Sequence, residues 1–266
     1  MLVIIMKRIH IYALAIVLII AMVAVLIFET GSLKPSASLV AYDNKPVPNS
    51  LLQMLKIPAN VSSSVGIGIA PKNNIEFLNA SPITLNGKPE ILYIGAEFCP
   101  FCAAQRWPML IALMRFGNFT GIKYMTSSAS DYAPSTPTFT FYNATYTSPY
   151  ISFVAVEQTT NTYQPLQNPN STQEFLFSKY DPKGGIPFIL FANQTVWENA
   201  DYDPLSVLGG KNWTEIAALT HNASSLQSLA IVGSANLMTA QICAIDNNSP
   251  ASVCDQPYIK KLEGSV

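Results

Sequence analysis

The segment Ile91-Leu-Tyr-Ile-Gly-Ala-Glu-Phe-Cys99-Pro-Phe-Cys102 decides how the rest of this chain of 266 residues is interpreted. It begins with an apolar run of about eight residues with strong β propensity and ends in a Cys-x-x-Cys motif. The residues that follow, Ala103-Ala-Gln-Arg-Trp107, favour a helix. The sequence therefore predicts a buried strand that leads into a helix, with two thiols at the junction.

Cys99 is predicted to be the more reactive of the two thiols. The first turn of a helix has free N–H groups and the positive end of the helix dipole, which together stabilise a thiolate and lower its pKa. Pro100 suits the first helical position because its missing N–H would have no partner there. Cys102 follows one turn later and is expected to lie deeper, to have the higher pKa and to form a reversible Cys99–Cys102 disulfide.

Half of a zinc site is the alternative interpretation of this cysteine pair. A structural zinc ion takes four ligands, commonly two such pairs or one pair with histidines. The remaining candidates are Cys243, Cys254 and His221, and the two cysteines are too far apart in the sequence for a typical zinc loop. We therefore expect redox chemistry, no metal site and no cofactor.

The segment from Ile91 to Pro108 resembles the active-site segment of the thioredoxin superfamily. A second hallmark is Gly184-Gly-Ile186-Pro187-Phe188, which resembles the loop that carries a cis-proline beside the dithiol in that superfamily. The resemblance implies an α/β fold, with a thioredoxin-like sheet and flanking helices. It also implies that Pro187 shapes the active site and that Ile186 pairs with a substrate peptide as an added strand.

Pro100 and Phe101, the two residues between the cysteines, are further expected substrate contacts. In the superfamily these two positions tune the reduction potential. Because neither is the histidine of strongly oxidising relatives, the resemblance implies a less oxidising couple.

The soluble part of the chain also resembles an archaeal family of membrane-anchored thioredoxin-like proteins of unknown function. The segments Phe98–Phe116, Thr136–Val156 and Ile242–Cys254 carry this resemblance. It implies a membrane anchor and a location outside the cytoplasm, and it implies no particular reaction.

The chain departs from the thioredoxin pattern in two places. Tyr93 occupies the position, six residues before the first cysteine, where thioredoxins often bury an acid that accepts a proton from the second cysteine. Glu97 is not an obvious replacement. The stretch between Cys102 and Pro187 is about twice as long as in a minimal thioredoxin, which predicts an insertion at about 127–183 between the helix and the cis-proline strand.

The predicted insertion is rich in aromatic residues, among them Phe139, Phe141, Tyr142, Tyr146, Tyr150 and Phe153. We expect these side chains to pack locally. A wall over the dithiol that selects substrates is the alternative.

Charged residues make up only 12% of the chain, and the net charge is −1. Without a basic patch, nucleic acid is not expected as a partner.

The uncharged run 9–28 is long enough to cross a bilayer as a helix, and Lys7-Arg8 precedes it. The positive-inside rule predicts residues 1–8 as a cytoplasmic head, 9–28 as the single transmembrane helix and the main domain outside the cell membrane. A signal peptide cleaved near Ser36-Ala-Ser38 is the alternative.

Composition divides the remainder of the chain into three parts. Residues 29–50, rich in Pro, Ser and Asn, are interpreted as a linker, 51–246 as the thioredoxin-like domain and 247–266 as a C-terminal tail. Within the domain, Phe188–Phe191 and Thr195–Trp197 predict a hairpin.

Cys243 and Cys254 are predicted to form a structural disulfide that closes the tail. Cysteines outside the cytoplasm suit an oxidising space, and a bond of this loop length is worth about 3 kcal/mol on the chain-entropy model. A second redox pair that exchanges with the first is the alternative.

Asn-x-Ser/Thr acceptor sites for glycosylation are more numerous than chance would give. The candidates are Asn60, Asn79, Asn118, Asn143, Asn170, Asn193, Asn212, Asn222 and Asn247. Glycans at several of these sites are expected to solubilise a surface that is poor in charge.

Together these features predict a membrane-anchored thiol–disulfide oxidoreductase outside the cytoplasm. Its expected partners are the thiols and disulfides of extracytoplasmic proteins and a membrane electron-transfer partner. The sequence does not decide between oxidase, isomerase and reductase. A non-catalytic surface glycoprotein or membrane-complex subunit, with the same fold and inert disulfides, is the alternative.

Overall fold

The computed structural model describes residues 37–71 and 74–264, which form one compact unit. The expected cytoplasmic head (1–8) and transmembrane helix (9–28) lie outside the described residues, as does Ser36 of the candidate cleavage site.

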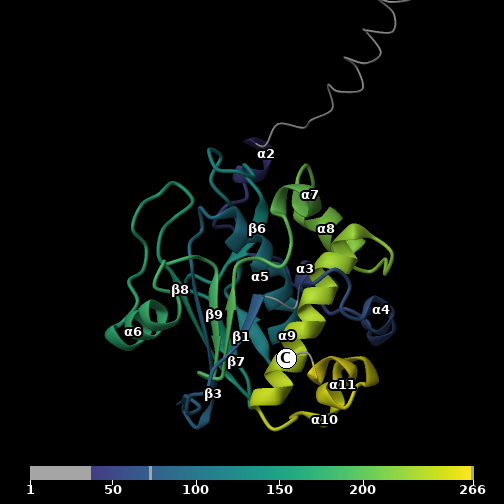
Figure 1. Cartoon of the computed structure of the whole chain (residues 1–266). Coiled ribbons are helices and arrows are strands. Elements are labelled where there is room, and N and C mark those ends of the chain that lie inside the picture. Colours follow the sequence, from purple (N-terminus) through teal and green to yellow (C-terminus); the bar gives the residue numbers. More distant parts are fainter. Residues whose placement is uncertain (1–36, 72–73, 265–266) are drawn as a thin grey trace, which may run out of the picture. The chain divides into compact units, whose positions relative to one another are not determined.

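A mixed sheet lies at the centre of the fold, and helices flank it (Figure 1). Its strands are β1 (Ile75–Phe77), β2 (Thr84–Leu85), β3 (Lys88–Gly95), β8 (Ser152–Glu157), β9 (Phe188–Phe191) and β10 (Thr195–Glu198). Strand β3 is central, because it pairs with β8 in parallel along one edge and with β9 in antiparallel along the other. Strands β9 and β10 form the predicted hairpin, and β1 pairs with β10.

Alternation of side chains along β3 gives the sheet two apolar faces. Ile91 and Tyr93 belong to the larger core, which includes α5 (Pro100–Leu113) and α9 (Gly233–Ile245). Leu92 and Ile94 belong to a smaller core. Helix α6 (Ser171–Tyr180) covers this core and contributes Leu176 to it. Figure 1 shows α6 and α9 on opposite sides of the strands. Burial on both faces thus explains the apolar run Ile91–Ile94 within β3.

The segment between α5 and β8 adds two small antiparallel pairs. These are β4 (Asn118–Thr120) with β7 (Thr145–Thr147) and β5 (Lys123–Thr126) with β6 (Pro137–Thr140). Aromatic rings of this region pack on one another as expected, with Phe119, Phe141, Tyr146 and Phe153 in mutual contact.

The predicted insertion at 127–183 has the wrong bounds. Strand β8 is a central strand, and α6 covers one face of the sheet, so both belong to the basic architecture. The added segment therefore lies before β8. Pattern alone could not reveal this, because an alternating segment such as β8 fits a strand of an insertion as well as a strand of the central sheet.

The predicted linker at 29–50 is wrong for its described part. Helix α4 (Ala59–Val65) lies beyond it, and the described part of the predicted linker contains α2 (Ala37–Val40) and the start of α3 (Asn49–Met54). Between them, the N–H groups of Asn44 and Val47 donate to the carbonyls of Tyr124 and Ile122, at 2.9 and 3.0 Å. Backbone pairing with β5 thus holds a segment whose composition is that of a linker.

The C-terminal residues are also part of the compact unit rather than a separate tail. The remaining helices are α7 (Pro204–Leu208), α8 (Trp213–Leu219), α10 (Ala251–Cys254) and α11 (Pro257–Glu263), and a π-helical turn, Ser228–Val232, precedes α9. The predicted disulfide between Cys243 and Cys254 is present, with a Cα–Cα distance of 5.6 Å. Ile259 and Leu262 of α11 are buried against the core.

One described helical stretch, Ser228–Ile245, is long and apolar enough to cross a membrane. In the structure 83% of it is buried inside the protein, as expected for a core helix.

Candidate functional site: a dithiol at the start of helix α5

Cys99 is the N-cap of α5. Its backbone is extended (φ −73°, ψ 120°), Pro100 takes the first helical position as predicted, and Sγ accepts a hydrogen bond from the Cys102 N–H at 3.2 Å. A side chain that accepts from the first turn satisfies one of the free N–H groups there. The sulfur therefore lies where the helix end stabilises negative charge.

The two cysteines are free thiols, so the expected Cys99–Cys102 bond is not formed and the structure is that of the dithiol. A hydrogen bond with the Cys102 side chain, opposed by burial, lowers the pKa of Cys99, and the charge of Arg106 contributes. Burial raises the pKa of Cys102 well above its ordinary value. As predicted, Cys102 is the more deeply buried of the two thiols.

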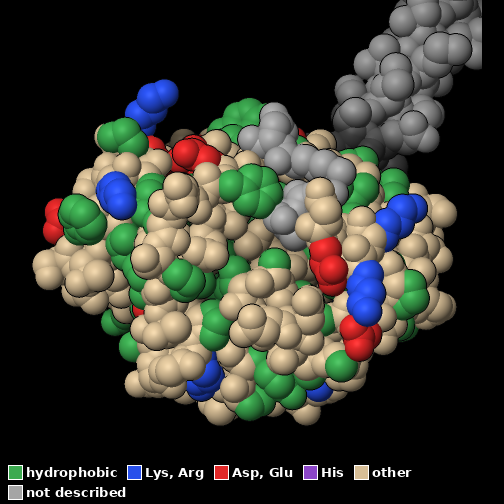
Figure 2. Space-filling model, turned by 60° about the horizontal axis from the view of Figure 1, so that its bottom comes forward, with side chains coloured by type: hydrophobic (Ala, Val, Ile, Leu, Met, Phe, Trp, Pro, Cys, Tyr) green, Lys and Arg blue, Asp and Glu red, His purple; other side chains and the backbone are tan. Residues whose placement is uncertain are grey.

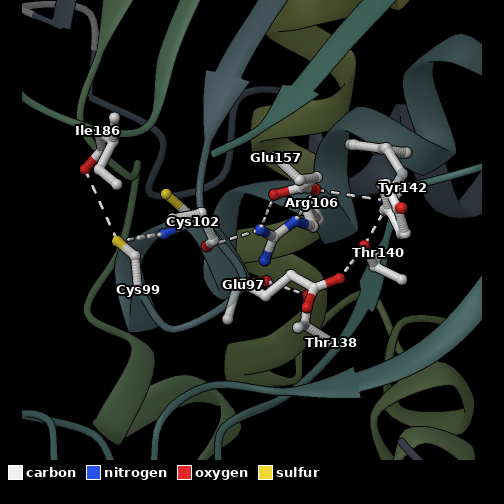
Figure 3. Close-up of polar contacts among 12 residues, drawn as sticks. Glu97, Cys99, Cys102, Arg106, Thr138, Thr140, Tyr142, Glu157 and Ile186 are labelled. Atoms are coloured by element: carbon white, nitrogen blue, oxygen red, sulfur yellow. Dashed lines mark hydrogen bonds and ion pairs between the residues drawn. The ribbon is translucent and has the colours of Figure 1, made fainter. Parts of the chain in front are cut away.

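Cys99 is less accessible than the sequence suggested, since only 5% of its surface is exposed, against 0% for Cys102. The peptide bond between Ile186 and Pro187 lies beside it and is cis. Cys99 Sγ is 3.8 Å from the Ile186 carbonyl oxygen (Figure 3). The fold thus brings together the two motifs, which lie far apart in the sequence, as the resemblance implied.

Two aromatic pairs flank the cysteines. Phe101 is 40% exposed and stacks on Tyr132, with ring centres 5.8 Å apart and planes within 3°. Tyr132 lies in the loop between β5 and β6. Its hydroxyl donates a hydrogen bond to Asp203 at 2.8 Å, which fixes the position of the ring. Phe98 packs on Tyr163 at 4.7 Å. Most aromatic residues of the segment between α5 and β8 pack locally, but Tyr132 stacks on Phe101, one of the two residues between the cysteines.

A buried ion pair that the sequence analysis did not predict lies one helical turn from Cys102. Arg106 donates from Nε and Nη2 to the two carboxylate oxygens of Glu157 at 2.9 and 2.6 Å, and from Nη2 to the Ala96 carbonyl at 2.8 Å. Both charged side chains are fully buried. Arg106 lies four residues after Cys102 on the same helix face, a spacing that could have revealed it. Nothing in the sequence pattern singles out Glu157.

Glu97 is buried on the other side of the Arg106 guanidinium (Figure 3). Burial raises the pKa of its carboxyl, which accepts a hydrogen bond from Thr140 at 2.6 Å. Tyr93 is also fully buried, with its ring edge against Phe141 at 5.5 Å, and burial raises its pKa well above the ordinary value.

The other candidate metal ligands do not join the dithiol. Cys243 and Cys254 are bonded to each other. His221 lies at the exposed end of α8, where Nε2 is 2.6 Å from the Met54 carbonyl oxygen. The residues proposed for a zinc site are therefore not gathered around Cys99 and Cys102.

The candidate glycosylation sites differ in accessibility. Asn193 is buried, accepts a hydrogen bond from Tyr180 and donates to the Ser81 carbonyl, so it is not an acceptor site in the folded protein. The side chains of Asn170 and Asn212 cap α6 and α8. The exposed candidates are Asn60, Asn79, Asn118, Asn143, Asn222 and Asn247, besides the capping residue Asn170.

The comparisons with known proteins give one match. Residues 75–177 match a domain of unknown function (DUF929), a stretch that contains the dithiol and ends within α6. Neither curated proteins nor solved structures give a significant match.

Proposed function

We propose that this protein is a thiol–disulfide oxidoreductase of the thioredoxin superfamily that acts on protein disulfides. The observation that carries the proposal is the position of Cys99 Sγ, which caps α5 and lies 3.8 Å from the carbonyl of the cis Ile186–Pro187 bond. The order strand β3, helix α5, parallel strand β8, helix α6 and hairpin β9–β10, followed by α9, supports the assignment to this superfamily.

The chemistry follows from the two different thiols. Cys99, whose pKa is lowered, attacks one sulfur of a substrate disulfide, and the other substrate sulfur leaves as a thiolate that takes up a proton. The mixed disulfide on Cys99 is then attacked by Cys102, which forms the Cys99–Cys102 bond and releases the second substrate thiol. Run in reverse, the same steps oxidise a substrate dithiol.

Ile186 supplies the substrate-binding backbone in this proposal. It makes no backbone–backbone hydrogen bond with the described residues, and it is partly exposed. An extended substrate segment can therefore pair with it as an added strand, while Phe101 and Tyr132 contact substrate side chains.

The proposed location is the outer face of the cell membrane, with the segment 9–28 as the single anchor and residues 1–8 in the cytoplasm. Figure 2 shows few and scattered charged side chains on one face of the molecule. A surface this poor in charge supports the proposal that glycans solubilise the protein. The proposed partners are extracytoplasmic protein thiols and disulfides and a membrane electron-transfer partner.

A disulfide-reduction assay with a peptide substrate tests the proposal. Cys99→Ser is expected to abolish turnover, whereas Cys102→Ser is expected to accumulate a covalent mixed disulfide with the substrate. Undiminished turnover by the Cys99→Ser variant would refute the proposed activity.

A non-catalytic surface glycoprotein or membrane-complex subunit is the second candidate, and the 5% exposure of Cys99 favours it. Iodoacetamide labelling of the gently reduced protein separates the two. One fast-reacting thiol, identified as Cys99 by peptide mapping, supports the enzyme, and uniformly slow thiols support the subunit.

A further inference from the structure

The hydroxyl of Tyr93 lies against Gly95 at the end of β3, the strand that leads to the dithiol. Tyr93 and Gly95 point to the same face of the strand, and a Cβ atom built on Gly95 would lie 2.1 Å from the Tyr93 Oη atom. A side chain at position 95 would therefore displace this hydroxyl. The glycine leaves room for a buried phenol at the point where the chain turns toward Cys99.

Two buried donors near the dithiol lack an acceptor. Among the described residues, neither Tyr93 Oη nor Arg106 Nη1 has a hydrogen-bond partner, although the other nitrogens of Arg106 are held by Glu157 and Ala96. The guanidinium carbon lies 5.8 Å from the centre of the Tyr93 ring. An unsatisfied buried donor costs about 1–3 kcal/mol, so two neighbouring ones point to an acceptor that forms during the reaction.

Cys102 is the buried group that can become this acceptor. It lies one helical turn before Arg106, and the groups that interact with it are Cys99 and Arg106 on α5 and Tyr93 on β3. The carboxylates of Glu97 and Glu157 face the Arg106 guanidinium. The charge of Arg106 lowers the pKa of Cys102 against the larger effect of burial. A thiolate at Cys102 in turn raises the pKa of Tyr93, because it favours the protonated phenol.

We infer that Tyr93 and Arg106 are positioning residues that hold Cys102 as a thiolate while it attacks the mixed disulfide on Cys99. This inference rests on the proposed function. The Cys99–Cys102 bond forms as the bond between Cys99 and the substrate sulfur breaks. The proton that Cys102 gives up ends on the departing substrate sulfur. Two fixed donors thus take the place of a buried base, and Glu157 keeps the guanidinium in position.

Release of thionitrobenzoate from a mixed disulfide on Cys99 tests this inference, because only attack by Cys102 releases the coloured thiol. The rate is measured against pH for the wild type and for Tyr93→Phe, which removes one oxygen. We expect the midpoint of the variant to rise by about one pH unit, so that release at pH 7 is roughly tenfold slower. Alkylation of Cys99 by iodoacetamide should change by less than about twofold, a factor worth about 0.4 kcal/mol.

Tyr202→Phe is the matched control. It removes another buried phenol oxygen, which donates to the Ala104 carbonyl at 2.6 Å, and it should lower stability without moving the pH midpoint. A Tyr93→Phe protein with the wild-type midpoint and rate would overturn the inference and leave the proposed function intact. A wild-type protein that releases no thionitrobenzoate at any pH would instead contradict both.

Discussion

Nη2 of Arg106 lies 2.6 Å from Oε2 of Glu157, and neither side chain is exposed to solvent. The pair connects α5, which begins with the dithiol, to the end of β8, the parallel neighbour of β3. Two charges in a core are stable only together, so the pair fixes the helix that carries the cysteines relative to the sheet.

Breaking this pair should destabilise the protein strongly. Arg106→Met leaves the Glu157 carboxylate buried without a counter-charge, and we expect a loss of about 3–5 kcal/mol in the free energy of unfolding. Urea denaturation followed by circular dichroism measures it. The double variant Arg106→Met, Glu157→Leu removes both charges and should recover most of the loss. Equal destabilisation in the single and double variants would show that packing, not charge, is responsible.

The reactivity of Cys99 should depend on Cys102. Because the hydrogen bond with Cys102 is the main cause that lowers the pKa of Cys99, Cys102→Ala should raise this pKa. The thiolate fraction at pH 7 then falls, and alkylation by iodoacetamide becomes slower. A pH series of alkylation rates gives the midpoint for each protein, and the prediction fails if the variant has the lower midpoint.

Stability should increase as the pH falls from 7 toward 5. Burial raises the pKa of Asp43, Asp201 and Asp246 to about 6, above their ordinary value of 3.8. The folded protein therefore binds protons more readily than the unfolded chain, so the stability that these groups contribute is full below pH 3.8 and is lost as the pH rises through 6. Urea midpoints at pH 5 and 7 check the sign. Asp201→Asn should flatten the dependence, since an amide does not titrate.

Removing Tyr132 should weaken binding of peptide substrates. Tyr132→Ala takes away the ring that stacks on Phe101 and exposes more of Phe101 to water. Aromatic contacts of this kind are worth about 1 kcal/mol or more at interfaces, so kcat/KM for a peptide disulfide should fall about fivefold or further. A small disulfide reagent, which does not reach the ring, is the control and should react at the wild-type rate.

The Cys243–Cys254 bond should resist mild reduction. Both residues are fully buried, so a reductant that opens an exposed disulfide reaches this one only after local unfolding. Mass spectrometry of alkylated peptides after graded dithiothreitol treatment follows each pair. Opening at the same dithiothreitol concentration as the first pair would favour the alternative of a second exchanging dithiol. Cys243→Ser with Cys254→Ser should lower stability by about 3 kcal/mol.

Local patterns in the sequence were enough to predict the elements that carry the site. The run 91–102 predicts β3 and the start of α5, and the run 188–197 predicts the hairpin of β9 and β10, because strand and capping signals are read within a few residues.

Features that depend on distant pairing could not be predicted in the same way. The bonds of Asn44 and Val47 to β5 and to Ile122, the residue before it, are made by the backbone, which composition does not encode. Glu157 ends an apolar strand like any surface acid, and only the fold places it beside Arg106. Tyr132 gave no signal either, since its role depends on the position of Phe101.

The parallel register of β3 and β8 places Gly95 opposite Glu157. A slip of one residue would turn Glu157 to the other face of the sheet, away from Arg106. A chain that mispairs these strands would then lose the counter-charge of Arg106, and with it the stable start of α5. Under the proposed function, reaction at Cys99 and Cys102 therefore depends on correct strand alignment, and misaligned copies should not react with the thiols of other proteins.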